Sequence, residues 1–195
     1  MNRVLAAVAG LALIMAGLLW LAAHKLDPPV ETIVASSLES LQQQNRLTPF
    51  AARFVTAVTS SKSQMMLSAQ KTLIIPAMVR YEVNLAKLKP NDLTWDSKAG
   101  TLQIILPPVE IAGPEFDLNQ TREYESGMVL LALTDVEKRL DAENRAKAKA
   151  DILAQAQAET LVRMAREAAV RAVERSFAMP LAAAGVEAKV TVGWR

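Results

Sequence analysis

The hydrophobic pattern of the chain begins with one uninterrupted apolar run. Residues 4–23 read VLAAVAGLALIMAGLLWLAA, twenty positions without a charged side chain. At about 1.5 Å per residue, a helix of this length spans the roughly 30 Å hydrocarbon core of a bilayer. Asp27-Pro28-Pro29 follows and stops the helix, because proline has no amide donor. The pattern predicts a transmembrane anchor with its flanks over residues 1–26, which contacts the lipid bilayer through residues 4–23.

Two fates of this segment are compatible with its composition. A cleaved signal peptide has a shorter apolar region, about 7–15 residues, that ends in an A-x-A-like site. The run here is longer and ends in Leu21-Ala22-Ala23, which favours a retained, single-pass signal-anchor. Arg3 before the run and Lys25 after it nearly balance, so the short N-terminal tail decides the orientation. We expect a protein of the bacterial inner membrane whose C-terminal domain is periplasmic or otherwise extracytoplasmic.

The next segments change from helical to strand periodicity. Residues 27–46 predict a linker and a short amphipathic helix, with apolar positions at Val30, Val34, Leu38 and Leu41. A soluble domain is expected over 47–195. Its first strand begins near Phe50, and its clearest strand runs over residues 71–85, where one face is apolar and the other carries Arg80, Glu82 and Asn84. The apolar face consists of Leu73, Ile75, Ala77, Val79, Tyr81, Val83 and Leu85.

A hairpin and an irregular stretch follow. Residues 93–96 and 101–106 read as paired strands, joined by a turn in which Gly100 can take a positive φ. Residues 109–127 contain Gly113-Pro114 and are expected to be irregular. Residues 186–194 alternate again and predict a final strand.

One long helix is expected over residues 134–178. This range has no Gly or Pro and carries acid-then-base pairs at i,i+4, such as Glu143/Lys147 and Glu159/Arg163. Its first half offers mostly alanine, so we expect that half to project, with a coiled-coil-like surface, while the second half packs on the sheet. The predicted fold class is α+β: an N-terminal transmembrane helix, an antiparallel-rich sheet, one long C-terminal helix and a final strand.

Composition removes several classes of chemistry. With 22 basic and 20 acidic side chains, the net charge of +2 gives no footprint for nucleic acid. There is no Cys, and the single His24 adjoins the apolar run, which excludes thiolate nucleophiles and multi-histidine metal sites.

The remaining polar clusters have ordinary structural interpretations. The acidic positions of residues 109–127 lack the spacing of a calcium loop, so a solvated loop is expected. They are Glu110, Glu115, Asp117, Glu123 and Glu125. Ser60, Ser61 and Ser63 lack a nucleophile motif. Met65-Met66 is expected to be a buried plug. We therefore predict no enzyme, and no catalytic, cofactor-binding or metal-ligating residue.

Two stretches resemble known families. YEVNLAKLKPNDLTWDSKAGTLQIILPPVEI, residues 81–111, resembles the bacterial domain of unknown function 4230, as does the layout of an acidic stretch, a long helix and a last strand. The resemblance implies an architecture and a membrane address and brings no catalytic residue. More loosely, ENRAKAKADILAQAQAETL, residues 143–161, is similar to the helix of the prohibitin/stomatin group, whose members assemble into membrane scaffolds.

Two functional hypotheses follow. The first is a membrane-tethered, non-enzymatic protein-interaction or scaffold module, in which the helix 134–178 binds a protein partner or another copy of the chain. The alternative is a module that binds lipid or a small apolar ligand at the membrane surface, in a groove between the sheet and the long helix.

The membrane anchor gives the first testable prediction. The full-length protein should sediment with membranes at high speed, and a variant that lacks residues 1–26 should stay in the supernatant. Quantitative blotting of both fractions measures this. Unprocessed full-length protein in the supernatant would contradict the anchor.

Overall fold

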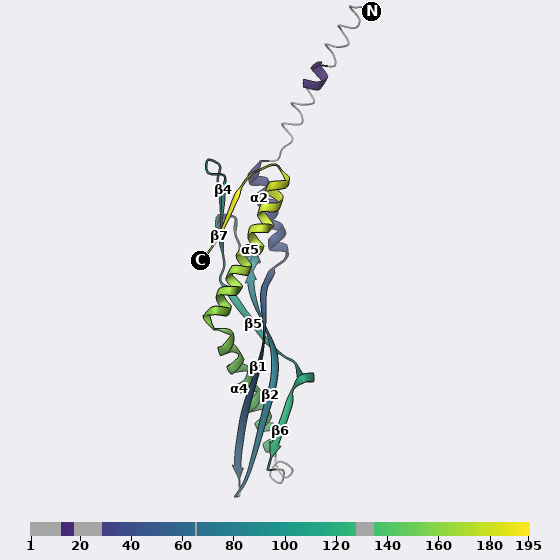
Figure 1. Ribbon diagram of the computed structural model, residues 1–195, viewed down its shortest axis with the longest axis vertical. Helices are drawn as coiled ribbons and strands as arrows, with labels where there is room; N and C mark the ends of the chain where they lie inside the picture. The colour runs from purple at the N-terminus through teal and green to yellow at the C-terminus, as the bar shows by residue number, and fades with distance from the viewer. Residues whose placement is uncertain (1–12, 18–28, 65, 128–134) are drawn as a thin grey trace, which may run out of the picture.

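The computed structural model describes residues 13–17, 29–64, 66–127 and 135–195. Residues 13–17 are helical, and the rest of the predicted membrane segment lies outside the described residues. Among the helices that the structure describes, none combines the length and apolar character needed to cross a bilayer. The remaining chain forms an elongated α+β body in which helices lie along two sheets (Figure 1).

The longer sheet is built on one hairpin. β1 (Arg46–Gln64) and β2 (Leu67–Asn84) pair antiparallel along nearly their whole length, and β2 also pairs with β5 (Val109–Phe116) and β6 (Arg122–Ser126). The odd-numbered apolar positions of β2 from Leu73 to Val83 are all buried, as the alternation predicted. The stretch 109–127 is therefore not irregular, and that expectation was wrong. Its charged side chains hid the strand pattern because they lie on sheet faces where they form ion pairs.

Pro76 lies within the central strand β2. At this point neither β5 nor β6 pairs with β2, so the backbone N–H that proline lacks has no strand partner to lose. β5 pairs with β2 from Ala77 onward, β6 pairs from Ile74 downward, and Asp117 donates its backbone N–H to the Pro76 carbonyl at 2.9 Å. The N–H and C=O of one strand residue point to the same side. The amide that Pro76 lacks would thus have faced the junction between β5 and β6, where η3 (Leu118–Gln120) interrupts the pairing.

The second sheet is small and lies at the same end of the body as α2 (Val30–Gln43) (Figure 1). β3 (Leu93–Asp96) pairs antiparallel with β4 (Thr101–Leu106), and the final strand β7 (Lys189–Trp194) pairs with β4 in parallel. The predicted hairpin and final strand are confirmed, and Gly100 has the expected positive φ of 61°. Parallel strands need a long connection between them, and the helical region between β4 and β7 provides it.

The long helix is divided in two. α4 (Val136–Ala156) and α5 (Glu159–Ala183) are separated at Gln157 and Ala158, where Ala158 has an extended ψ of 130°. The prediction of a single helix over residues 134–178 was therefore wrong, although no Gly or Pro marks the break. The cause is tertiary: Ile152 and Ala156 of α4 pack on Tyr81 and its neighbours in the long sheet, while α5 continues onto the small sheet.

The first half of the helical region does not project. Ala148 of α4 packs on Leu73 and Ile75, and Leu140 packs on Ala69. Alanines allow this helix to approach the sheet closely, which is why a stripe without large side chains is still buried. The expectation of a free first half is corrected.

The end of α5 also differs from the sequence prediction. The helix continues through Pro180 to Ala183, then ends as Gly185 takes a φ of 75°. Val186 donates to the Leu181 carbonyl and Gly185 to the Ala182 carbonyl, both at 3.0 Å. This is the Schellman arrangement, in which a residue with positive φ satisfies the last carbonyls of a helix.

The short helix after the membrane segment belongs to the folded body. α2 (Val30–Gln43) buries Ile33, Ser37, Leu38 and Leu41. Ile33, Leu38 and Leu41 share one core with Phe177 of α5 and Leu102 of β4. The amphipathic helix is confirmed, but the domain boundary at residue 47 is too late, because α2 packs within the core.

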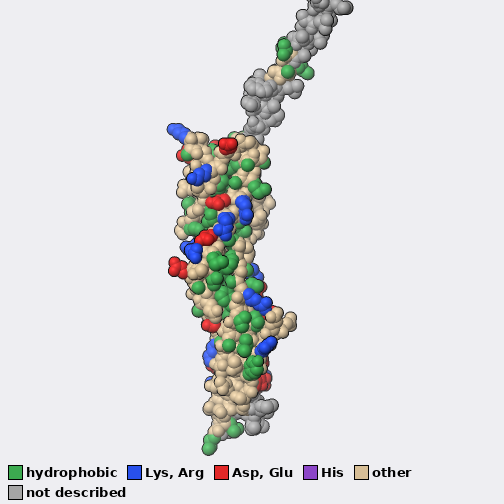
Figure 2. All heavy atoms as spheres, in the orientation of Figure 1, with side chains coloured by type: hydrophobic (Ala, Val, Ile, Leu, Met, Phe, Trp, Pro, Cys, Tyr) green, Lys and Arg blue, Asp and Glu red, His purple; other side chains and the backbone are tan. Residues whose placement is uncertain are grey.

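The tip of the long hairpin is exposed. Met66 has a positive φ of 64° and is fully exposed, and Leu67 beside it is also exposed. Hydrophobic side chains are visible at this end of the molecule in Figure 2. The expectation of a buried plug was wrong for Met66, and Met65 lies outside the described residues.

Tyr81 provides a test of the junction between the helices. Its buried hydroxyl donates to the Ala156 carbonyl at 2.7 Å, at the C-terminal end of α4. Tyr81→Phe should lower the free energy of unfolding by about 1–2 kcal/mol, because a buried carbonyl loses its partner. Urea unfolding measures the change. Tyr124→Phe, at an exposed tyrosine, is the matched control and should change little; equal effects would contradict a role for the Tyr81 hydroxyl.

Candidate functional site

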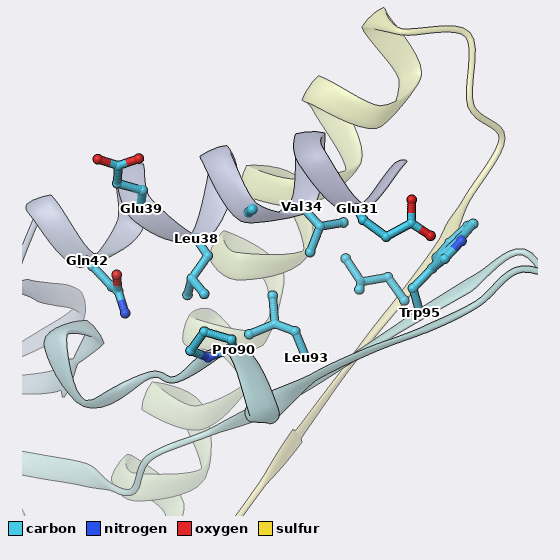
Figure 3. Close-up of a pocket in the computed structure, with 10 residues that line it drawn as sticks. Glu31, Val34, Leu38, Glu39, Gln42, Pro90, Leu93 and Trp95 are labelled. Atoms are coloured by element: carbon cyan, nitrogen blue, oxygen red, sulfur yellow. The ribbon is translucent and has the colours of Figure 1, made fainter. Parts of the chain in front are cut away.

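A groove of about 740 Å³ lies between α2 and the face of the small sheet. Figure 3 shows Val34 and Leu38 pointing from α2 toward Pro90 and Leu93 across the gap. Trp95 closes one end of the groove, beside Glu31. Ligand pockets in proteins range from about 300 to 1,000 Å³ and are mostly apolar with a few polar groups. The size and lining of this groove match that description.

Local sequence patterns bring these side chains to the groove. Val34 and Leu38 are four residues apart, so they lie on one face of α2. Leu93 and Trp95 alternate along β3, so they lie on one face of the sheet. Both pairs are apolar, yet Val34, Leu93 and Trp95 are only partly buried. α2 and α5 together do not fully cover this face, which leaves the apolar floor open near β3.

Three polar side chains from α2 border the groove. Glu31 and Glu39 are exposed, and Gln42 donates its amide Nε2 to the Leu88 carbonyl at 2.7 Å. Glu31 lies near Trp95, whereas Glu39 points outward on the far side of α2 (Figure 3). The groove therefore combines an apolar floor with one carboxylate, that of Glu31, at the Trp95 end. Sequence analysis had expected a groove at the long helix and did not single out these residues.

The structure places the predicted acidic stretch in β5, in β6 and at Asp117 between them, and its carboxylates have basic partners. Glu110 on β5 accepts from Lys87 at 2.6 Å and from Arg46 at 2.9 Å, and these contacts lower the pKa of Glu110. Glu115 contacts Arg80, and Asp117 contacts Arg53. The five positions are thus not brought together as one site, and the solvated acidic loop was a wrong expectation.

Lys71 binds the remaining two carboxylates of that stretch. Its side chain is only 2% exposed, and its Nζ lies 2.6 Å from Asp141, 2.7 Å from Glu125 and 2.9 Å from Glu123. Burial lowers the pKa of Lys71, hydrogen bonds from these carboxylates raise it, and the balance is a pKa above the ordinary value. Asp141 comes from α4 and the two glutamates from β6, so one buried ammonium joins the helix layer to the sheet.

The other sequence candidates also have structural partners. Arg80 donates to Glu82 at 3.0 Å on the outer face of β2, and Glu82 also accepts from Arg46 at 3.0 Å. Ser60 accepts from Lys147 at 2.9 Å. Within the part of the chain that the structure describes, no cluster of His, Cys, Asp or Glu is arranged to hold a metal ion. Opposite charges are interspersed on the face shown in Figure 2 rather than gathered by sign.

The fold is that of a small α+β domain with an apolar groove between α2 and the small sheet. The family model described as "Protein of unknown function (DUF4230)" matches residues 39–192, so the chain belongs to this family. The resemblance noted in residues 81–111 is thereby confirmed. No curated protein and no solved structure is significantly similar to the chain. The likeness to the prohibitin/stomatin group stays a prediction.

The buried ammonium of Lys71 gives a stability prediction. Lys71→Met should lower the free energy of unfolding by about 1–3 kcal/mol, because carboxylates gathered around Nζ would lose their cation, although their partial exposure allows water to compensate. Since the pKa of Lys71 is raised on folding, its contribution is present at neutral pH and is lost only as the pH rises above the usual lysine range. Thermal unfolding at pH 7 and above pH 10 measures both effects.

The control for this prediction is Lys138→Met on α4. The Lys138 side chain is 86% exposed and forms an ion pair with the exposed Asp135, so its removal should have little effect. Equal losses for the two variants would mean that general charge, rather than the buried contact of Lys71, sets the stability.

Proposed function

We propose that this protein is a membrane-tethered, non-enzymatic module of the bacterial envelope whose groove binds the apolar chain of an amphiphile. The groove between α2 and the small sheet carries this proposal. Its floor is apolar, its volume suits one hydrocarbon chain, and its border offers few polar groups. The tether is the predicted membrane helix of residues 4–23, in a single-pass arrangement with the domain outside the cytoplasm.

The position of the groove supports a ligand from the bilayer. α2 begins at Val30, shortly after the apolar run that ends at Ala23, so the groove lies at the tethered end of the domain. A lipid or other amphiphile leaving the membrane would meet this end first. The exposed tip at Met66 lies at the opposite end of the body (Figure 1).

The scaffold hypothesis receives less support from the packing. The apolar stripe of α5, which includes Val173, Phe177 and Leu181, is buried against α2 and the small sheet. Ile152 and Ala156 of α4 are buried against the long sheet. The apolar stripe that was expected to bind a partner is therefore largely buried, although Met164 and Met179 of α5 remain exposed.

Quenching of Trp95 fluorescence tests ligand binding in the groove. In a Trp20→Phe/Trp194→Phe background, Trp95 is the remaining tryptophan of the chain. The full-length protein, reconstituted in lipid nanodiscs, would be titrated with a dodecyl glycoside brominated near the chain end. We expect saturable quenching, because the bromine would lie on the groove floor beside the indole.

Two variants of α2 make the test specific. Ala35→Phe places a ring in the groove and should abolish the saturable quenching, since Ala35 lines the groove from an exposed position. Gln43→Phe adds the same ring at an exposed position that does not line the groove and should bind as the parent does. Unsaturable quenching, or equal binding by both variants, would disprove the proposed site.

A further inference from the structure

The polar border of the groove consists mainly of hydrogen-bond acceptors. Glu31 carries a carboxylate, and Gln42 uses an amide hydrogen on the Leu88 carbonyl while its Oε1 remains an acceptor. The carboxylate of Glu39 points outward, away from the groove (Figure 3). Among the residues that the structure describes, no lysine or arginine lines the groove. Because an acceptor-rich border cannot satisfy a phosphate or carboxylate, it favours a ligand head that donates hydrogen bonds and carries positive charge.

The charge along the groove is uneven. Glu31 lies beside Trp95 (Figure 3), so this end carries a carboxylate. Lys89 precedes Pro90 at the other end. The first turn of α2 contributes a partial positive charge near Glu31, but a full carboxylate outweighs a helix terminus of about half a charge. A cationic head is therefore favoured at the Trp95 end.

Trp95 adds a second attraction for a cation at that end. Its ring is only partly buried and borders the groove next to Glu31. The face of an indole attracts an ammonium group, and tryptophan is the strongest side chain in this respect. The groove thus has one carboxylate and one indole at the same end. Together they could bind an ammonium group whose hydrocarbon chain continues along the apolar floor.

We propose that the groove selects a single-chain amphiphile with a primary ammonium head. The head lies between Glu31 and Trp95, and the chain extends over Leu93 toward Leu38 and Pro90. This assignment rests on the proposed function and adds the chemical class of the ligand. A primary ammonium is preferred over a quaternary one because it has N–H donors for the carboxylate.

Competition among four probes with the same decyl chain tests the head group. Decylammonium, decyltrimethylammonium, decyl sulfate and decyl glycoside would displace the brominated glycoside from the Trp95-only protein in zwitterionic nanodiscs, below their micelle concentrations. Decylammonium should bind about tenfold more tightly than the glycoside, as expected for one partly exposed charge-assisted contact. The trimethylammonium probe should fall between them, and the sulfate should bind most weakly.

Two substitutions on α2 separate a direct contact from a general field. Glu31→Gln should bring decylammonium and the glycoside to within about twofold of each other while leaving glycoside binding unchanged. Glu39→Gln removes the same charge from the same helix but from the side that points outward, and should keep most of the preference. Equal losses in both variants would overturn the placement of the head beside Glu31.

The possible failures are distinguishable. If the glycoside binds saturably but all four heads bind alike, the head-group assignment is wrong and the proposed function stands. If no decyl probe binds saturably, the proposed function itself fails. If a lysine-rich peptide displaces the brominated probe and decylammonium does not, the groove takes a protein side chain, which also overturns the amphiphile assignment.

Discussion

The hydrogen bond from the Tyr81 hydroxyl to the Ala156 carbonyl lies where the two halves of the body meet. α4 covers the long sheet and ends at Ala156. α5 starts three residues later, packs on the same sheet through Ala165, and then covers the small sheet through Phe177 and Leu181. A helix end leaves carbonyls without intrahelical partners, and a buried one must find a donor. Tyr81 supplies that donor from the sheet core, so Ala156 can be buried at the end of α4, directly before the exposed residues Gln157 and Ala158 where the helical region changes direction.

This change of direction also determines where the groove lies. α5 occupies one part of the small sheet, next to α2, and brings the chain back to β7, which pairs in parallel with β4. β3 is the strand farthest from β7, and the apolar side chains Leu93 and Trp95 remain only partly covered there. The groove therefore results from two helices on a three-stranded sheet, in the described part of the chain, and needs no separate structural element.

Charge has a structural role at the other end of the body. Lys71 is buried among carboxylates of β6 and α4, and Asn144 of α4 donates its amide to the Lys71 carbonyl at 2.8 Å. The alanine-rich helix α4 has few large side chains, so it lacks the packing that would otherwise fix it on the sheet. The ammonium and the amide together compensate for that lack. Glu123, Glu125 and Asp141 would suggest a metal site if they were considered alone, but the ammonium of Lys71 already neutralises them.

The sequence by itself determined the elements with a simple period: the buried face of β2, the hairpin of β3 and β4, the helix α2, the last strand and the family. These depend on local spacing of apolar residues and on residues 81–111. Only the tertiary structure decided the break at Ala158, the strands β5 and β6, and the groove. The break has no local signal, the two strands carry charged faces that read as a loop, and the groove joins residues from α2 and β3 that are far apart in the chain. Such features arise from contacts between elements, which spacing along the chain does not encode.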